Sequence, residues 1–292
     1  MIAKLTGTGI WSGALRYGDP TAVADAAAEV ESLGYTALWI PDAGGDVFTP
    51  IGALLAATQR IVAATGILNL WMHSPEETAQ HHAALTAEHG DRFLVGIGVS
   101  HGPMIDRILE QAGTYQQPLA RTNAFLDGLD AASPPLAAAD RAIAALGPKM
   151  LGLARDRSAG AHPYLVTPEH TALAREILGP DALLAVEQGV VLEADPTTAR
   201  ATGRQALATY LGLPNYVNNW FRLGFDEADV ANGGSDRLID ALFAWGDEDT
   251  IRARLRAHHD AGADHVCIQT IGGVQGSDLP LAHWRALAPA AT

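Results

Sequence analysis

The sequence predicts a (β/α)₈ barrel, an α/β fold in which eight parallel strands alternate with helices. Two observations support this prediction. Eight short apolar segments recur along the 292-residue chain, as expected for strands buried on both faces of a parallel sheet. Between them, a helix-capping residue followed by proline occurs five times, and proline is favoured in the first turn of a helix. A doubly wound parallel sheet is the alternative arrangement of the same units.

The apolar segments are the expected strands. In chain order they cover residues 7–11, 37–41, 61–68, 93–99, 142–147, 162–166, 183–192 and 265–271. The expected helix starts are Asp19-Pro20, Thr49-Pro50, Ser74-Pro75, Thr167-Pro168 and Asp195-Pro196. Ser74 is followed three positions later by Glu77, which completes a capping-box pattern.

Segment 213–246 is longer than a connection between two barrel strands requires, and we expect it to be an insertion. Its aromatic residues are Tyr216, Trp220, Phe221 and Phe225, and its predicted helix passes through Leu238, Ile239, Leu242 and Phe243. Tyr216 and Trp220 are one helical turn apart, which is typical of ordinary packing. At the active-site face of a barrel, the segment could also cover a substrate. Because no linker rich in serine, proline or glycine divides the chain, a single domain over residues 1–292 is expected.

Composition excludes several classes of function. The 19 basic and 33 acidic side chains give a formal charge of −14, which disfavours nucleic-acid and membrane-surface binding. The single cysteine, Cys267, cannot form an internal disulfide or a thiolate metal cluster. The sequence shows neither a signal-peptide pattern nor the roughly 20 apolar residues of a membrane span. We therefore expect a cytoplasmic protein that binds no metal and acts on a small molecule.

If the barrel closes, functional residues gather at the carboxyl ends of its strands. Two of these ends, residues 64–69 and 96–102, contain glycine, which lets backbone approach a flat ring or a phosphate. Asp42, at the end of the second strand, either hydrogen-bonds a ring or substrate or caps the adjoining loop. His101 is the candidate general acid or base because imidazole titrates near neutral pH, although a lone histidine is also common as a structural residue.

Segment 146–150 joins the fifth predicted strand to its helix and is the candidate phosphate site. It combines Gly147, a helix N-terminus and Lys149, one of only two lysines in the chain. Backbone N–H groups and the helix dipole favour an anion at such a position. The alternative interpretation of Gly147-Pro148 is a simple turn. The glycines between residues 96 and 102 are spaced one residue too far apart for the dinucleotide fingerprint, so a nicotinamide site is not expected.

Four segments together resemble the bacterial luciferase-like superfamily. They are GYTALWIPD (34–42), ATGILN (64–69), DRFLVGIGVSH (91–101) and ALGPKM (145–150). Within that superfamily the chain is most similar to the actinobacterial branch of oxidoreductases that use the deazaflavin coenzyme F-420. Segments 213–220 and 262–266 fit that branch too. The resemblance extends from the first strand nearly to the C-terminus.

The resemblance implies a barrel with an insertion near its seventh strand, a homodimer, and a ring held across the strand ends. It implies a non-proline cis peptide bond at Gly66-Ile67 behind the ring, and it puts Asp42 at the acidic position that faces the ring. His101 and Asp42 are the candidate catalytic residues. The strand ends and the resemblance together give the candidate cofactor-binding residues, which are Asp42, Thr65, Gly66, Ile67, Asn69, Gly98, Val99, Ser100, His101, Leu146, Gly147, Pro148, Lys149, Met150, Tyr164 and Thr167.

Two positions depart from the pattern of deazaflavin dehydrogenases in this superfamily. Ala43 replaces the histidine that follows the acidic residue, and His101 stands where some members have a catalytic glutamate. The expected function is an F-420-dependent oxidoreductase that transfers a hydride between the ring and a small apolar substrate, with His101 as proton source. The alternatives are a flavin mononucleotide (FMN) monooxygenase, a catalytically silent cofactor-binding protein, and a barrel lyase or isomerase that acts on a phosphorylated substrate.

Overall fold

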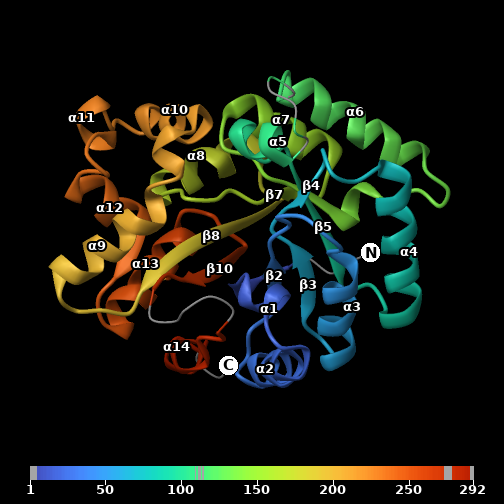
Figure 1. Ribbon diagram of the computed structural model, residues 1–292, viewed down its shortest axis with the longest axis horizontal. Coiled ribbons are helices and arrows are strands. Elements are labelled where there is room, and N and C mark those ends of the chain that lie inside the picture. Colours follow the sequence, from blue (N-terminus) through green and yellow to red (C-terminus); the bar gives the residue numbers. More distant parts are fainter. Residues whose placement is uncertain (1–4, 109, 111–112, 114, 273–277, 290–292) are drawn as a thin grey trace.

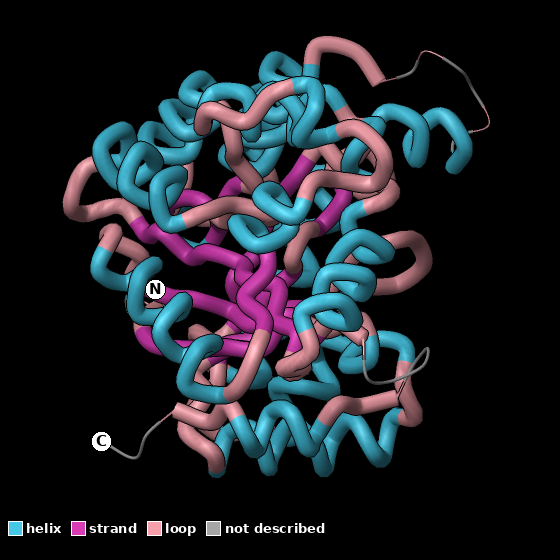
Figure 2. Tube along the Cα trace, turned by 90° about the vertical axis from the view of Figure 1, so that its left-hand side faces the viewer, coloured by secondary structure: helices cyan, strands magenta, loops and turns pink. Residues whose placement is uncertain are grey.

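The computed structural model describes residues 5–289 except 109, 111, 112, 114 and 273–277. Its central feature is a ring of parallel strands surrounded by helices (Figures 1 and 2). The ring consists of β1 (Gly7–Trp11), β2 (Ala37–Ile40), β3 (Val62–Thr65), β5 (Phe93–Gly98), β6 (Arg141–Ile143), β7 (Gly160–Ala161), β8 (Leu183–Val191) and β10 (His265–Thr270). Neighbours in this order pair in parallel, and β10 pairs with both β8 and β1. The barrel prediction is confirmed, and the doubly wound alternative is wrong because the sheet closes.

The helices lie outside the ring (Figure 2). They are α1 (Ala14–Tyr17), α2 (Pro20–Ser32), α3 (Phe48–Ala57), α4 (Pro75–His89), α5 (Gly102–Ile108), α6 (Pro118–Ala131), α7 (Pro148–Arg157), α8 (Pro168–Leu178), α9 (Pro196–Leu207), α10 (Pro214–Arg222), α11 (Glu227–Val230), α12 (Asp236–Leu242), α13 (Glu248–Asp260) and α14 (Leu281–Ala286). Two short 3₁₀ turns cover Ala138–Asp140 and Tyr210–Gly212. None of the helices in the described residues is both long and apolar enough to cross a membrane.

Four of the five predicted capping residues cap helices as expected, each accepting a backbone hydrogen bond. They are Asp19, Ser74, Thr167 and Asp195. The fifth prediction is wrong, because α3 starts at Phe48, before Thr49-Pro50. Asp46 Oδ1 accepts hydrogen bonds from the backbone N–H groups of Phe48 and Thr49 at 2.9 and 3.2 Å. Asp46, three residues before Thr49, therefore supplies the capping hydrogen bonds that were expected from Thr49.

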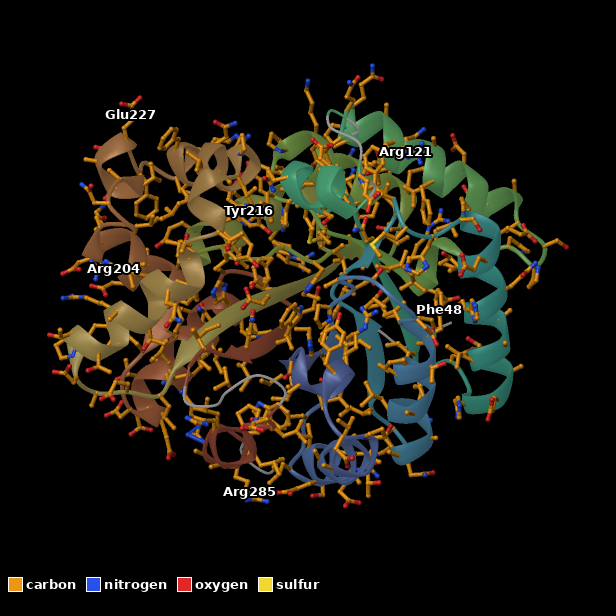
Figure 3. The ribbon with its side chains drawn as sticks, in the orientation of Figure 1. Phe48, Arg121, Arg204, Tyr216, Glu227 and Arg285 are labelled. Carbon is orange, nitrogen blue, oxygen red and sulfur yellow. The ribbon has the colours of Figure 1, made fainter. Side chains whose placement is uncertain are left out.

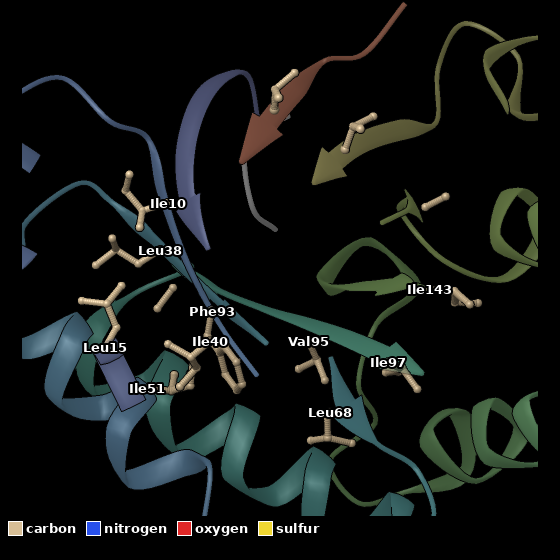
Figure 4. Packing of buried hydrophobic residues seen from close by; sticks show 14 of the residues in the cluster. Ile10, Leu15, Leu38, Ile40, Ile51, Leu68, Phe93, Val95, Ile97 and Ile143 are labelled. Atoms are coloured by element: carbon tan, nitrogen blue, oxygen red, sulfur yellow. The ribbon is translucent and has the colours of Figure 1, made fainter. Parts of the chain in front are cut away.

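Side chains alternate between two layers along the strands. Leu38 and Ile40 belong to the large cluster between the barrel and its helices, part of which is shown in Figure 4. Ala37 and Trp39 belong to a smaller cluster with Ala64, Leu94, Ala142, Ala185 and Cys267. Because successive side chains of a strand point to opposite faces, the smaller cluster fills the barrel interior. Cys267 is fully buried there.

Three predicted strands differ from those observed. The strand expected at residues 162–166 is observed earlier in the chain, at Gly160–Ala161. Residues 162–166 are not in a strand, and Leu165 among them has a left-handed backbone (φ 53°) that does not continue extended pairing. The strand expected at 61–68 is divided at Gly66 into β3 and β4 (Leu68–Asn69), and β4 pairs with β5. The fifth predicted strand, 142–147, ends at Ile143, and Ala144 to Gly147 form the loop that leads into α7.

The predicted insertion follows β8, the seventh strand of the ring, and contains α10, α11, α12 and β9 (Phe243–Trp245). It lies beside α8 and α9 (Figure 1). Phe243 is not in the expected helix but begins β9, which pairs with β8 opposite Gly189. A Cβ at position 189 would lie 2.8 Å from Phe243 Cδ1, so glycine is needed for this pairing. Trp220 Nε1 donates to Leu165 O at 3.2 Å and ties the insertion to the barrel.

Candidate functional site

The cis peptide bond predicted at Gly66-Ile67 is present at the end of β3. Trp11, at the end of β1, donates from Nε1 to Gly66 O at 3.0 Å, and Gly66 N donates to Ile40 O at 2.8 Å. A Cβ on Gly66 would lie only 2.4 Å from Trp11 Nε1. The glycine therefore makes room for an indole that the sequence-based site did not include.

The glycines of β5 are closely packed against other protein atoms. A Cβ at Gly96 would lie 2.0 Å from Thr65 O, and one at Gly98 would lie 2.6 Å from Ile67 Cγ1. Thr65 Oγ1 also donates to Gly96 O at 2.8 Å. These contacts hold the segment around Gly66 against β5. Close approach to a ligand is therefore not the only reason for glycine at positions 96 and 98, because neighbouring protein atoms also occupy that space.

Asp42 is enclosed by four protein donors, and its side chain is fully buried. Oδ1 accepts from Arg16 Nη1 at 3.0 Å and from Gly44 N at 3.2 Å. Oδ2 accepts from Asn69 N at 3.1 Å and pairs with His73 Nε2 at 2.9 Å. Burial alone would raise the pKa of Asp42, but the hydrogen bonds from His73, Asn69 and Arg16 hold it below its usual value. Of the two interpretations, loop capping is observed directly.

His73 is a residue that sequence reasoning missed. Ala43 leaves no imidazole directly after Asp42, and His73 supplies one from the loop after β4, 31 positions away. Its ring also meets Phe48 edge-on, with centroids 5.5 Å apart. No local sequence motif predicts the contact of His73 with Asp42, because it depends on the pairing of β2 with β3. Asn69 shapes the same loop, where its Oδ1 accepts from Trp71 N at 3.1 Å.

His101 follows β5 and lies against two tyrosines of the segment after α9. Its ring centroid is 5.9 Å from that of Tyr210 and 5.6 Å from that of Tyr216. Tyr164 is 5.5 Å from Tyr210 and 5.8 Å from Trp11. We call Trp11, Tyr164, Tyr210 and Tyr216 the aromatic wall. Tyr216, labelled in Figure 3, belongs to α10 of the insertion and contacts a candidate catalytic residue, His101, in addition to packing with Trp220.

The hydroxyl groups of the aromatic wall are linked in one direction. Tyr210 OH donates to Tyr164 OH at 3.3 Å, and Tyr164 OH donates to Gln269 Oε1 at 2.9 Å. Burial raises the pKa of Tyr164 and Tyr210 above the usual range, so both hydroxyls are neutral. The wall can exclude water from the strand ends without placing a fixed charge there.

His101 has a nitrogen that the protein leaves free. Nδ1 is buried and has no hydrogen-bond partner among the described residues. Burial lowers the pKa of His101, so the imidazole is mainly neutral at pH 7. The preceding Ser100 has a left-handed backbone (φ 56°), and its buried Oγ also lacks a partner within the described chain. Val99 O is already used, because Trp71 Nε1 donates to it at 2.9 Å.

Glu187 on β8 is a second residue missing from the predicted site. Its side chain is buried, Oε2 accepts from Leu165 N at 3.1 Å, and Oε1 has no partner among the residues described. Burial raises the pKa of this carboxyl to about 8. The available signal was a single acidic residue inside the otherwise apolar and amide-bearing strand 183–192.

The candidate phosphate segment forms the start of α7. Pro148 is the first helical residue, and Gly147 caps the helix without a side-chain hydrogen bond. Lys149 is exposed there, whereas Met150 packs against the core. Arg222 of α10, which the prediction did not include, approaches the same point, with Nη2 3.5 Å from the position of a Cβ on Gly147. Two cations therefore flank an uncapped helix N-terminus.

Two predicted binding residues near this segment have structural partners. Leu146 O accepts from His170 Nε2 at 2.8 Å. Thr167 is the N-cap of α8, where its Oγ1 accepts from His170 N at 3.4 Å, and it is 3% exposed. Tyr164, by contrast, is part of the aromatic wall at the strand ends, and His101, which Ser100 precedes, lies against that wall. The predicted set thus divides into residues that face the strand-end site and residues that support its loops.

Comparisons with known proteins fit this geometry. The family model described as luciferase-like monooxygenase matches residues 2–265. A protein of Mycobacterium tuberculosis, whose name assigns it provisionally to the coenzyme F-420-dependent oxidoreductases, is 24% identical over 326 residues, covering 88% of this chain and 92% of that protein.

Three solved structures illustrate the likeness in fold. An F-420-dependent secondary alcohol dehydrogenase in complex with an F-420–acetone adduct has a TM-score of 0.72 at 14% identity, covering 97% of this chain and 96% of that one. The coenzyme F-420-dependent tetrahydromethanopterin reductase from Methanopyrus kandleri has a TM-score of 0.70 at 17% identity, covering 91% of this chain and 93% of that one. The third structure is the oxygenating constituent of 3,6-diketocamphane monooxygenase from a Pseudomonas putida plasmid, in complex with FMN. Its TM-score is 0.69 at 14% identity, covering 97% of this chain and 96% of that one.

Proposed function

The chain belongs to the luciferase-like monooxygenase family, and on that premise we propose that it is an oxidoreductase that binds coenzyme F-420. It transfers a hydride between the deazaflavin ring and a small apolar substrate. The observation that carries the proposal is His101, a partly buried and mainly neutral imidazole that lies against Tyr210 and Tyr216. Its Nδ1 atom is buried and has no hydrogen-bond partner among the described residues. The F-420 relatives named above support the choice of cofactor.

The residues present fit a phosphate-bearing ring cofactor. Gly147, Lys149 and Arg222 would hold its phosphate, because a helix N-terminus and two cations attract an anion. The segment at Gly66-Ile67 would support the ring, and Ser100 Oγ offers a free polar atom beside it. When bound, the cofactor supplies the hydride chemistry, and the protein must supply orientation and a proton.

His101 would move that proton at Nδ1. Because the imidazole is neutral at pH 7, it accepts the proton of a substrate hydroxyl when the substrate is oxidised, and it returns the proton in the reverse direction. The aromatic wall excludes water around it. Asp42 acts as a positioning residue, because its carboxylate fixes the loop at Gly44 and the start of the Asn69 loop.

A second candidate function is an FMN-dependent monooxygenase of the same fold. The description of the matched family and the FMN-bound structure favour it. The two candidates differ in the cofactor that binds. The test is equilibrium binding of F-420 and of FMN to the purified chain, followed by fluorescence. Tight binding of FMN with none of F-420 would overturn our proposal.

A catalytically silent protein would bind F-420 equally well but turn over nothing. Single-turnover oxidation of reduced F-420, with a panel of small ketones and enones, separates this possibility from an active enzyme. We expect His101→Ala to slow any such turnover about 100-fold or more while F-420 still binds. The expected homodimer and the cytoplasmic location remain predictions.

A further inference from the structure

We propose that Glu187 is a hydrogen-bond donor inside the barrel, on the side of the strands' carboxyl ends, where it recognises a carbonyl oxygen of the bound ligand. This inference rests on the proposed function, because either the ring or its substrate supplies that oxygen. Glu187 would determine which ligands the site accepts, and it would hold a proton there without being the residue that reacts.

The strand register directs Glu187 into the barrel. On β8, Ala185 belongs to the interior cluster, whereas Val186 belongs to the outer one. Because side chains alternate, Glu187 shares the face of Ala185. It pairs in register with Cys267 of β10, another interior residue. Glu187 thus lies one layer closer to the carboxyl ends than Ala185, toward the site.

One carboxyl oxygen has a protein partner and the other has none. Leu165, whose left-handed backbone is uncommon for a branched residue, donates its N–H to Glu187 Oε2 at 3.1 Å. Oε1 is buried without a partner, and no cation in the described chain forms a salt bridge with the carboxyl. A buried carboxyl without a counter-charge favours its neutral form. Because Oε2 accepts a hydrogen bond, the proton resides on Oε1, which becomes an unused donor.

The groups around Glu187 do not use this donor. A charge on Glu187 would raise the pKa of Tyr164, Tyr210 and Tyr216, and that of Cys267 in β10. The Tyr164 hydroxyl already accepts from Tyr210 and donates to Gln269.

His162, which follows β7, stacks on Trp39 with ring centroids 4.2 Å apart, and burial lowers its pKa to about 4. It is therefore neutral and offers no counter-charge. His162 Nε2 is likewise buried without a partner, so neither it nor any other described residue hydrogen-bonds Glu187 Oε1.

The chemistry of this donor selects its ligand. A neutral carboxylic acid among neutral tyrosines donates well to an uncharged acceptor such as a carbonyl oxygen. An ammonium ligand would instead require an ionised carboxylate. The deazaflavin ring and a ketone substrate both carry carbonyl oxygens, and the experiment below distinguishes these two sources.

The test compares Glu187→Gln, which retains a donor of similar shape, with Glu187→Leu, which removes it. Exposed Glu176 provides the matched control, Glu176→Gln. Dissociation constants of F-420 and FMN are measured by fluorescence at pH 6.5 and pH 9.5, and that of cyclohexanone on the F-420-loaded protein by calorimetry. We expect Glu187→Leu to weaken binding about tenfold and Glu187→Gln to change it little.

Two further readouts exclude a merely structural role. Wild-type affinity should fall at pH 9.5 relative to that of Glu187→Gln, because ionised Glu187 no longer donates. The infrared C=O stretch of the neutral carboxyl, absent from Glu187→Gln, should shift when the ligand binds. A change confined to F-420 and FMN identifies the ring as the source of the oxygen, and one confined to cyclohexanone identifies the substrate.

Equal affinities of the wild type and Glu187→Leu, with an unshifted infrared band, would overturn the proposal and indicate only a buried water at Oε1. Failure of the wild type to bind either F-420 or FMN would overturn the proposed function instead. In that event cyclohexanone is added to the unloaded protein. An unshifted band would then overturn the role of Glu187 as well, and a shifted band would support it.

Discussion

Replacing Glu187 with glutamine should remove a pH-dependent penalty on folding. Burial raises the pKa of Glu187 in the folded chain to about 8, whereas its ordinary value is 4.5. Below pH 4.5 the carboxyl is neutral in both the folded and the unfolded chain. Between pH 4.5 and 8 only the unfolded chain loses the proton, so the free energy of unfolding falls as the pH rises.

The expected magnitude follows from the size of the pKa difference. Each pH unit within this interval lowers the free energy of unfolding by about 1.4 kcal/mol. From pH 5.5 to pH 8 the contribution of Glu187 therefore falls by about 3 kcal/mol. Glutamine does not titrate, and its side-chain oxygen can still accept from Leu165 N. Glu187→Gln should consequently lack this part of the slope.

Urea unfolding at pH 5.5 and pH 8 measures the effect directly. The wild type, Glu187→Gln and the control Glu176→Gln are compared, so that the titration of other groups cancels. We expect the wild type and the control to lose about 3 kcal/mol more than Glu187→Gln between the two pH values. Identical slopes for all three proteins would refute the argument, because Glu187 would then be ionised in the folded chain at neutral pH.

Three other substitutions test separate parts of the account. His101→Ala should lower kcat about 100-fold or more and leave the dissociation constant of F-420 nearly unchanged, whereas equal losses in both would make His101 a binding residue. Lys149→Ala should weaken F-420 binding by about 1–3 kcal/mol, and Arg60→Ala, which removes a cation from the opposite end of the barrel, should not. Asp42→Asn should lower the free energy of unfolding at pH 7 by about 3 kcal/mol, because Arg16 and His73 lose a buried partner. Because the pKa of Asp42 in the folded chain is lowered, this stability is present above pH 3.8 and is lost as the pH falls below it. The free energy of unfolding of Asp42→Asn should therefore depend less on acid pH than that of the wild type, as measured by urea titrations. An unchanged urea midpoint at pH 7 would contradict the enclosed geometry.

Much of the fold could be predicted because the relevant signals are local. A capping residue before Pro20 or Pro75 defines a helix start with neighbouring atoms alone. The errors arose where a distant contact decides the structure. Phe243 continues an apolar helical pattern, yet it joins β8 because Gly189 leaves space for its ring. Leu165 lies in the segment expected to be a strand, yet its N–H and C=O hydrogen-bond Glu187 and Trp220, which are distant in the sequence.

The candidate site shows the same division. His101 was predictable as the polar residue that ends an apolar strand. The pairing of His73 with Asp42 was not, because the two residues meet only after β2 and β3 pair. Glu187 was visible as an acidic residue within an apolar strand, but only the structure shows its missing partner.

The measurement that tests the central claim most directly is the relative affinity of the purified chain for F-420 and FMN. Both cofactors carry a ring and a phosphate, so both address the site at the strand ends. The account predicts that F-420 binds at least about tenfold more tightly, a difference of about 1.4 kcal/mol, and that Lys149→Ala weakens this binding. Tighter binding of FMN, or F-420 binding that is unaffected in Lys149→Ala, would contradict it.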